Sequence, residues 1–386
     1  MTAITPSTVA VARHYQQCTR CVMDTTATDI IFEKSGTCNY CTQFESNLKR
    51  AMLSASESIE VKDQFIAKLK KTGQGKQYDC IVGVSGGVDS SYALYLAVKH
   101  GLRPLAVHLD NGWNSELATH NIANLIKSLG VDLYTHVIDW DENRDLQRSF
   151  FAANVVDIEL LMDNAMLALN YQQAGKYGTK YILAGTNMAT EGMAMPAHWN
   201  HFKRDAKNIR SIQKCFGTRP IKTHRLHSVL DYLWYERIRK IHWISFLDYF
   251  SYVKSEAVKV LVADCMYKPY PYKHYESVFT RFYQAYILPR KFGIDKRRLH
   301  LSTLIMSGQI SRDEALELMT IDPYPDPRQM QQDRTFVLKK LGFTDYEFDI
   351  YLATTGLPHA MYGTEETLYK FVMKVHAGLF KRRRKE

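Results

Sequence analysis

The chain has 386 residues, of which 46% are hydrophobic and 23% are charged, and its formal net charge is +10. This composition excludes an acidic disordered protein and provides enough length for one large core with appendages. No apolar run approaches the roughly 20 residues of a membrane span, and no secretory signal is evident, so we expect a cytoplasmic protein without a membrane span.

Four of the seven cysteines form two C-x-x-C pairs near the N-terminus. Cys18 and Cys21 are followed, after sixteen residues, by Cys38 and Cys41. Two such pairs at this separation are typical of a closed tetrahedral Zn²⁺ site, and four thiolates leave no open position for a substrate. We therefore predict a structural zinc ribbon over residues 14–45, followed by a connecting helix over 46–77.

Residues 78–215 alternate short apolar strands with helices. Strands are expected at 78–84, 103–109, 133–138 and 181–184, and helices at 90–99, 116–129 and 164–177. This rhythm predicts an α/β fold with a doubly wound parallel sheet, in which ligands bind beyond the carboxyl ends of the strands. After residue 215 the strand signal fades. We expect 216–386 to be a mostly helical, basic substrate or partner region, with one helical stretch over 228–262.

A glycine-rich turn joins the first strand to the first helix of this domain. Its glycines let the backbone approach an anion, and the amides that open the helix point toward that anion. Serine hydroxyls can add donors, and Asp89 is assigned to Mg²⁺. The residues assigned to this phosphate-binding turn are Ser85, Gly86, Gly87, Val88, Asp89, Ser90 and Ser91.

The turn lacks the lysine of a Walker A loop and resembles the PP-loop of the ATP pyrophosphatase superfamily. The resemblance implies a HUP-like ATP-binding domain over 78–215 that binds ATP and releases pyrophosphate. It also implies that the ends of the second and fourth strands face the nucleotide. There we assign His108 and Asp110, and Gly185, Thr186 and Asn187.

Three stretches, 18–26, 107–114 and 273–302, together resemble the N-acetyl sugar amidotransferase family, the WbpG and PseA type of bacterial surface-polysaccharide enzymes. The resemblance implies that the amide oxygen of an N-acetyl group on a nucleotide-activated sugar attacks ATP, giving an adenylylated imidate and pyrophosphate. Ammonia then displaces AMP and leaves an acetamidino group. The product would serve lipopolysaccharide O-antigen or related synthesis.

The same resemblance implies a separate glutaminase subunit that supplies ammonia, often encoded with a cyclase-like barrel subunit. The chain shows no amidotransferase nucleophile of its own, and its oligomeric state is left open. Basic side chains in 273–302 can bind polyanions, and a histidine or glutamate there can move a proton. With Asp89, the residues assigned to catalysis are Lys273, His274, Glu276, Arg281, Lys296 and His300.

Two further features bear on this interpretation. Asn164 stands where the family usually carries a histidine, which would require another acid–base group if that histidine is catalytic. The positive charge is concentrated in 198–244, 268–300 and the tail 381–386. We interpret the two internal segments mainly as counter-charge for ATP, pyrophosphate and a nucleotide sugar, and the tail as a solvated end.

Two alternative functions compete with the interpretation as a sugar amidotransferase. A tRNA thiolase also combines a PP-loop with C-x-x-C elements, but thiolases generally need a catalytic cysteine in the nucleotide domain. Cys80 is expected inside a strand, and Cys215 falls outside the strand ends. A nucleic-acid-binding zinc ribbon would explain the basic charge but leaves the PP-loop unexplained. The preferred interpretation involves no nucleic acid.

Overall fold

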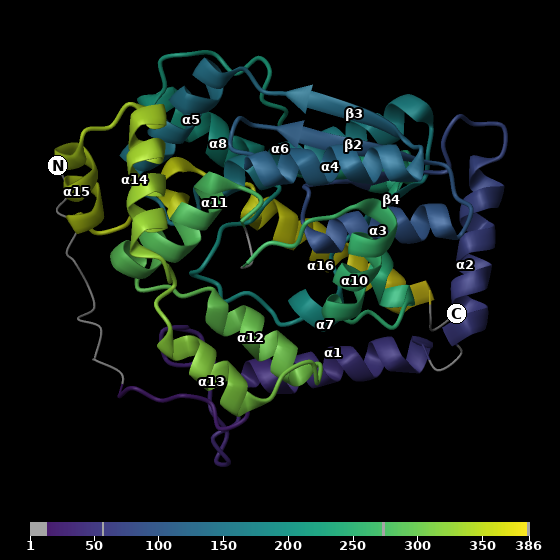
Figure 1. The fold of residues 1–386 in the computed structure, drawn as a ribbon, viewed down its shortest axis with the longest axis horizontal. Helices are drawn as coiled ribbons and strands as arrows, with labels where there is room; N and C mark the ends of the chain where they lie inside the picture. Colours follow the sequence, from purple (N-terminus) through teal and green to yellow (C-terminus); the bar gives the residue numbers. More distant parts are fainter. Residues whose placement is uncertain (1–13, 56–57, 272–274, 384–386) are drawn as a thin grey trace.

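The computed structural model describes residues 14–55, 58–271 and 275–383. Its centre is a five-stranded, fully parallel sheet with the order β3-β2-β1-β4-β5. The strands are β1 (Cys80–Gly83), β2 (Pro104–Asp110), β3 (Asp132–Val137), β4 (Tyr181–Ala184) and β5 (His242–Ser245). The predicted doubly wound parallel sheet is confirmed (Figure 1).

Helices cover both faces of this sheet. On one face lie α3 (Val88–Lys99), α4 (Glu116–Leu129) and α10 (Lys254–Cys265), where Leu94 packs in a cluster with Val82. On the other lies α6 (Leu160–Tyr177), where Leu169 packs with Ile81. Neighbouring residues of β1 thus point to opposite, equally buried faces, which is why β1 is a continuous apolar run rather than an alternating one.

The sheet extends beyond the four strands that we predicted. The expected helical stretch over 228–262 is wrong in its middle, where β5 pairs with β4 in parallel. It is preceded by α9 (Val229–Leu233) and the π-helical η1 (Trp234–Ile238), and followed by the 3-10 helix η2 (Phe246–Tyr249). Four residues between aromatic helices are too few to show a strand period. One strand of the nucleotide-domain sheet therefore comes from beyond residue 215.

The remaining elements surround the sheet, and the predicted mostly helical C-terminal region is confirmed. They are α1 (Asn39–Ala55), α2 (Ser58–Gly73), α5 (Trp140–Ala153), α7 (Met188–Glu191), α8 (Ala206–Phe216), α11 (Val278–Phe282), η3 (Tyr283–Phe292), α12 (Arg297–Met306), α13 (Arg312–Thr320), α14 (Pro327–Leu341), α15 (Asp345–Ala353), η4 (His359–Tyr362) and α16 (Glu366–Arg383). In the part of the chain that the structure covers, we find no helix with the length and apolarity needed to cross a bilayer.

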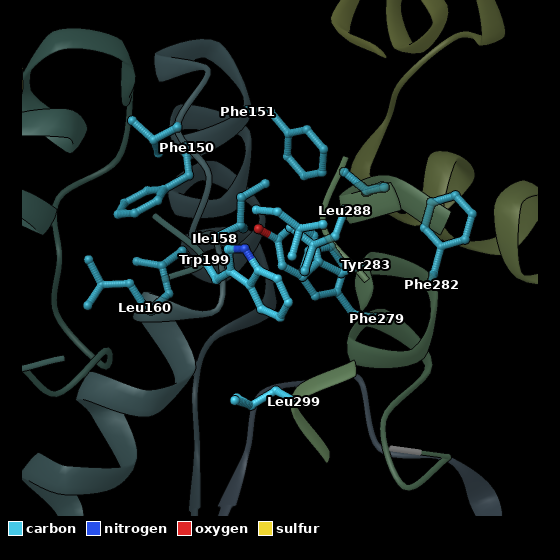
Figure 2. Packing of buried hydrophobic residues seen from close by; sticks show 14 of the residues in the cluster. Phe150, Phe151, Ile158, Leu160, Trp199, Phe279, Phe282, Tyr283, Leu288 and Leu299 are labelled. Carbon is cyan, nitrogen blue, oxygen red and sulfur yellow. The ribbon is translucent and has the colours of Figure 1, made fainter. Parts of the chain in front are cut away.

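A second core, which contains many aromatic side chains, joins the sheet domain to the C-terminal helices (Figure 2). Phe150 and Phe151 come from α5, Phe279 from α11 and Tyr283 from η3, and Trp199 lies among them. All five are buried. Because residues more than a hundred positions apart share one core, the C-terminal helices are held firmly against the domain that contains the parallel sheet.

His227 is buried beside two tyrosines and gives a pH prediction. Its ring stacks on Tyr171, with centroids 4.9 Å apart, and Tyr235 lies 6.3 Å away. Burial lowers the pKa of His227 to about 4. The unfolded chain has a histidine pKa of about 6.5, so between these values it binds more protons than the folded chain, and stability falls as the pH falls.

We expect His227→Phe to remove this contribution while keeping the stacking. The free energy of unfolding should then depend less on pH between about pH 6.5 and pH 4, by up to about 1.4 kcal/mol per pH unit. Urea unfolding of both proteins at about pH 7 and about pH 5 measures the difference. Equal losses of stability in the two proteins would contradict the prediction.

Candidate active site

The four N-terminal cysteines come together in a buried cluster. Their four Sγ atoms lie within 4.8 Å of one another, with separations of 3.9 Å for Cys18 and Cys41, 3.7 Å for Cys21 and Cys38, and 3.7 Å for Cys38 and Cys41. A tetrahedron with zinc–sulfur bonds of 2.3 Å has edges of about 3.8 Å, whereas a disulfide would bring two sulfurs to about 2.05 Å. The donor set therefore fits zinc.

Backbone and side-chain contacts support this cluster from two sides. The amide of Cys38 lies 3.3 Å from the Cys18 sulfur, a contact that favours a thiolate. From α13, Arg312 donates to the carbonyl oxygens of Cys18 at 3.0 Å and Cys21 at 3.3 Å. From α12, Arg298 pairs with buried Asp24 at 3.0 Å. Arg298 thus anchors the cysteine-containing segment to α12. The same helix also contributes residues to the wall of the cavity described below.

The PP-loop turn connects β1 to α3 in the predicted strand–turn–helix context. Gly86 has a φ of +83°, and a Cβ there would lie 3.0 Å from the carbonyl oxygen of Ala118, so glycine is required. The Ser90 hydroxyl accepts from the Ser85 amide and donates to the Gly87 carbonyl, both at 3.2 Å. The turn is therefore closed by its own side chains before any ligand binds.

Asp89 occupies the first turn of α3 and accepts a hydrogen bond from the hydroxyl of Tyr252. Burial raises the pKa of Tyr252, and the negative charges of Asp89 and Glu191 raise it further. Two carboxylates thus lie near one hydroxyl beside the turn, and such oxygens are the ligands that Mg²⁺ prefers. Of the seven residues that we assigned to the phosphate-binding turn, only Ser85 lines the cavity described below, and Ser91 is fully buried.

Two tyrosines that sequence reasoning missed hold the same turn from the segment after α10. Tyr267 and Tyr270 both donate to the carbonyl oxygen of Gly86, at 3.0 Å and 3.1 Å. Asn121 of α4 fixes their segment by donating to the carbonyl and accepting from the amide of Lys268, each at 2.8 Å. In sequence these tyrosines are indistinguishable from the other aromatics of the region.

The end of β2 places His108 beside the turn. The Nδ1 of His108 lies 2.8 Å from the carbonyl oxygen of Val84, which can only accept, so Nδ1 carries the proton. Its Nε2 can then accept from the side-chain amide of Asn114 at 2.9 Å. Asp110 instead accepts from the amide of Gly112 at 2.9 Å and shapes the loop.

At the end of β4, a glycine lies directly against the backbone that follows the PP-loop turn. A Cβ on Gly185 would lie 2.6 Å from the backbone nitrogen of Ser90, so only glycine allows this approach. Thr186 contacts a serine hydroxyl of β5 at 3.0 Å, and Asn187 caps α7 by accepting from the Thr190 amide at 2.8 Å. Of the five predicted strand-end residues, only His108 lines the cavity that opens beyond them.

That cavity has a volume of about 830 Å³, within the usual range for a small-molecule site. The nucleotide domain contributes Ser85 and His108 to its lining. The C-terminal region contributes four residues that we assigned to catalysis: Glu276, Arg281, Lys296 and His300. Lys273 and His274 lie outside the described residues.

Glu276 reaches the PP-loop because its segment pairs with the loop after β2. Asn114 and Ser277 form an antiparallel bridge, and the amide of Ser115 donates to the Glu276 carbonyl at 2.9 Å. The carboxylate of Glu276 lies 3.7 Å from the point where Gly87 would carry a Cβ. The PP-loop turn and the C-terminal motif therefore lie at one site.

Arg281 lines the cavity but is held by a buried ion pair. It donates to both carboxylate oxygens of Asp333, at 2.6 Å and 2.7 Å, and its guanidinium lies 4.4 Å from the ring centroid of Tyr275. Burial would lower the pKa of Arg281, but the hydrogen bonds and charge of Asp333 outweigh burial and raise it. Arg281 thus stays charged and fixed in place.

We expect Arg281→Ala to lower the free energy of unfolding by about 3–5 kcal/mol, because it leaves Asp333 buried without its partner. A matched control is Arg144→Ala, since Arg144 forms an exposed pair with Asp141 at 3.3 Å and should lose less than about 1 kcal/mol. Urea unfolding measures both values. Equal losses in the two variants would show that the Arg281 pair is not a structural anchor.

The cavity lining does not carry the excess of positive charge that we expected. Five lysines and arginines face six aspartates and glutamates, so the interpretation of the basic segments as counter-charge is wrong for this lining. Lys296 pairs with Glu159 at 3.1 Å, and Lys203 pairs with Asp157 at 2.6 Å and Asp163 at 2.8 Å. Sequence reasoning missed these acids because nothing in their local sequence marks them.

Asn164, the departure from the family pattern, is a buried structural residue. Its side-chain amide donates to the carbonyl oxygens of Lys203 at 2.8 Å and His227 at 2.7 Å, and its oxygen accepts from the His227 amide at 2.9 Å. Asn164 itself is fully buried and does not line the cavity. The side chain therefore ties two loops together, and Asp163 beside it is the residue that faces the site.

Comparisons with known proteins agree with this geometry. A family model described as NAD synthase, a family of the PP-loop ATP pyrophosphatase superfamily, matches residues 59–214. A second model, described as the C-terminal domain of LPS biosynthesis protein WbpG-like proteins, matches residues 276–376. The two matches confirm the resemblance to the WbpG and PseA type of amidotransferase, and they support an ATP-dependent C–N ligase of lipopolysaccharide biosynthesis that uses ATP and Mg²⁺.

Among solved structures, the NH3-dependent NAD synthetase of Campylobacter jejuni is 12% identical, with a TM-score of 0.28 over 53% of this chain and 82% of that one. The NMN synthetase of Francisella tularensis is 18% identical, with a TM-score of 0.25 over 55% of this chain and 99% of that one. A search of curated proteins gave no match.

Proposed function

We propose that the chain converts the N-acetyl group of a nucleotide-activated sugar into an acetamidino group for O-antigen or related surface polysaccharide. The observation that carries this proposal is the shared cavity, in which the PP-loop residue Ser85 and the WbpG-like residues Glu276 and His300 line one space. This arrangement supports the proposal because a nucleotide held at the PP-loop turn would lie close to the polar side chains of the C-terminal motif.

The first step adenylylates the amide. The carbonyl oxygen of the acetamido group forms a bond to the α-phosphorus of ATP, and the bond from that phosphorus to pyrophosphate breaks. The amides that open α3 and the serine hydroxyls of the turn bind the phosphates. Asp89 and Glu191 would hold Mg²⁺, which neutralises charge on the leaving pyrophosphate.

The second step uses ammonia. A carbon–nitrogen bond forms at the imidate carbon, the bond to the AMP oxygen breaks, and one proton leaves the attacking nitrogen. Glu276 and His300 line the cavity as candidate proton acceptors. We propose that ammonia comes from a partner glutaminase, with a cyclase-like barrel subunit as a further partner.

The cysteines favour this function over tRNA thiolation. Cys80 is completely buried in β1, and burial raises its pKa, so a reactive thiolate is disfavoured. Cys215 is exposed on α8. Among the described residues that line the cavity there is no cysteine.

The test is release of AMP and pyrophosphate with a panel of acetamido sugar nucleotides, ATP, Mg²⁺ and ammonium salt. We expect sugar-dependent release of both products and an amidine in the sugar product by mass spectrometry. Reactions without sugar are the control. Failure of every sugar on the panel, or AMP release that depends on tRNA, would overturn the proposal.

A further inference from the structure

Two helical segments expose apolar stripes that neither the core nor the cavity uses. In each segment three large side chains recur at helical spacing, which places them on one face. On α9 and η1 they are Leu230, Trp234 and Ile238, exposed by 65%, 52% and 64%. On α16 they are Leu368, Phe371 and Val375, exposed by 42%, 64% and 47%. Large exposed apolar groups at such spacing mark interaction surfaces.

The two segments are neighbours, and their opposite faces attach them to the protein. The ring of Tyr232 on α9 lies 6.0 Å from that of Tyr369 on α16, and Tyr369 also packs on Phe202 at 4.5 Å. Tyr235 of η1 packs on Tyr171 of α6 at 5.4 Å. The tyrosines therefore form the inner contacts, while the stripes face away from them.

Positive charge surrounds both stripes. Four cations on or directly after these elements are exposed: Arg237, Lys240, Lys370 and Lys374. The nearby acids are less exposed than these cations: Asp231 accepts from the Ser228 hydroxyl at 2.6 Å, and Glu236 accepts from the Tyr171 hydroxyl at 2.5 Å. Glu366 pairs with Lys370 at 2.6 Å and offsets its charge, so Arg237, Lys240 and Lys374 contribute most of the exposed positive charge. In sequence, five of the six residues 381–386 are Lys or Arg.

We propose that this face binds the surface of an anionic phospholipid bilayer. Aromatic and aliphatic side chains flanked by lysine and arginine are the composition that inserts into the interfacial region of a membrane and pairs with acidic headgroups. The charge is complementary to such a surface over both segments. None of the six apolar side chains lines the cavity, so the proposed membrane contact uses side chains other than those of the candidate active site.

The proposal also accounts for charge that the cavity does not use. The cavity lining holds more acids than bases, so the net +10 of the chain lies outside it. An anionic bilayer attracts such a basic face when the two lie within about one Debye length of each other. Insertion of the apolar side chains then provides a second contribution to binding that salt does not screen.

Co-sedimentation of the full-length protein with vesicles tests this. Vesicles of phosphatidylcholine alone are compared with vesicles containing about one third phosphatidylglycerol, at about 0.1 M and about 0.5 M NaCl. We expect binding to the anionic vesicles, weakened by salt, and a loss of at least about tenfold in the Trp234→Glu/Phe371→Glu double variant. Tyr346→Glu, at a 76% exposed position on α15, is the matched control and should bind normally.

A second variant keeps the test decisive if the double variant does not fold. Lys370→Glu/Lys374→Glu replaces two exposed cations, at the cost of the surface ion pair between Lys370 and Glu366, and should also weaken binding to anionic vesicles by about tenfold or more. Absence of binding by the unaltered protein, or equal binding by all variants, would overturn the proposal. So would a dimer of the unaltered protein that Phe371→Glu converts to a monomer, because a second copy would then cover the face.

Discussion

Replacing Asp89 by asparagine should reduce AMP and pyrophosphate release by about 10³-fold or more while the protein stays folded. Asp89 lies in the first turn of α3, next to the phosphate-binding turn, and with Glu191 it provides the carboxylate oxygens that Mg²⁺ prefers. An amide is a poor ligand for Mg²⁺, so the charge that develops on pyrophosphate would lose its main counter-charge. Steady-state assays with sugar nucleotide and ammonium measure the loss.

The matched control is Asp264→Asn. Asp264 on α10 accepts a hydrogen bond from Tyr95 of α3 at 2.6 Å, so it resembles the Asp89–Tyr252 contact, but it lies on α10 rather than beside the PP-loop turn. We expect this variant to keep activity within about threefold, since it removes one partly exposed hydrogen bond. Full activity in Asp89→Asn would show that the assignment of the PP-loop is wrong.

The second large effect is expected for Cys38→Ser. The Sγ of Cys38 lies 3.7 Å from those of Cys21 and Cys41, so one serine opens the tetrahedral set. The free energy of metal binding is also folding free energy for such a small segment, and we expect a loss on the order of 5 kcal/mol or more. Metal analysis and thermal unfolding should show loss of about one zinc per chain and a much lower midpoint.

Cys215→Ser is the control for this experiment, because Cys215 is an exposed cysteine on α8 outside the buried cluster. Its zinc content and unfolding midpoint should match those of the unaltered protein. A chelator should reproduce the effect of Cys38→Ser in the unaltered protein. If Cys38→Ser kept its zinc and its midpoint, the cluster would not be a structural zinc site.

Features that depend on neighbouring residues were predictable from the sequence. The PP-loop needs glycines and serines within seven consecutive positions, and each cysteine pair spans four, so local chemistry defines both. The buried strands β1, β2 and β4 were also found, because they are apolar runs between turn residues. The resemblance added Glu276 and His300, which the fold brings to the cavity.

Features that depend on distant partners were not predictable. Arg281 has the same local sequence whether it binds substrate or pairs with Asp333, which lies 52 positions away. Tyr267 acts on Gly86 across 181 positions, and Lys203 meets Asp157 across 46. Without the fold, nothing assigns such side chains to one another, and this is also why the charge balance of the cavity was misjudged.

The docking of the ribbon has a consequence for how the chain is made. The amide of Val22 donates to the hydroxyl of Ser302 at 3.2 Å, across 280 positions of sequence. At a synthesis rate of about 5–20 residues per second, the ribbon leaves the ribosome about 15–60 s before its docking helix exists. During this interval its four thiols are not covered by α12 and α13. Early metal capture would therefore protect the nascent chain from oxidation and misfolding until the two ends meet.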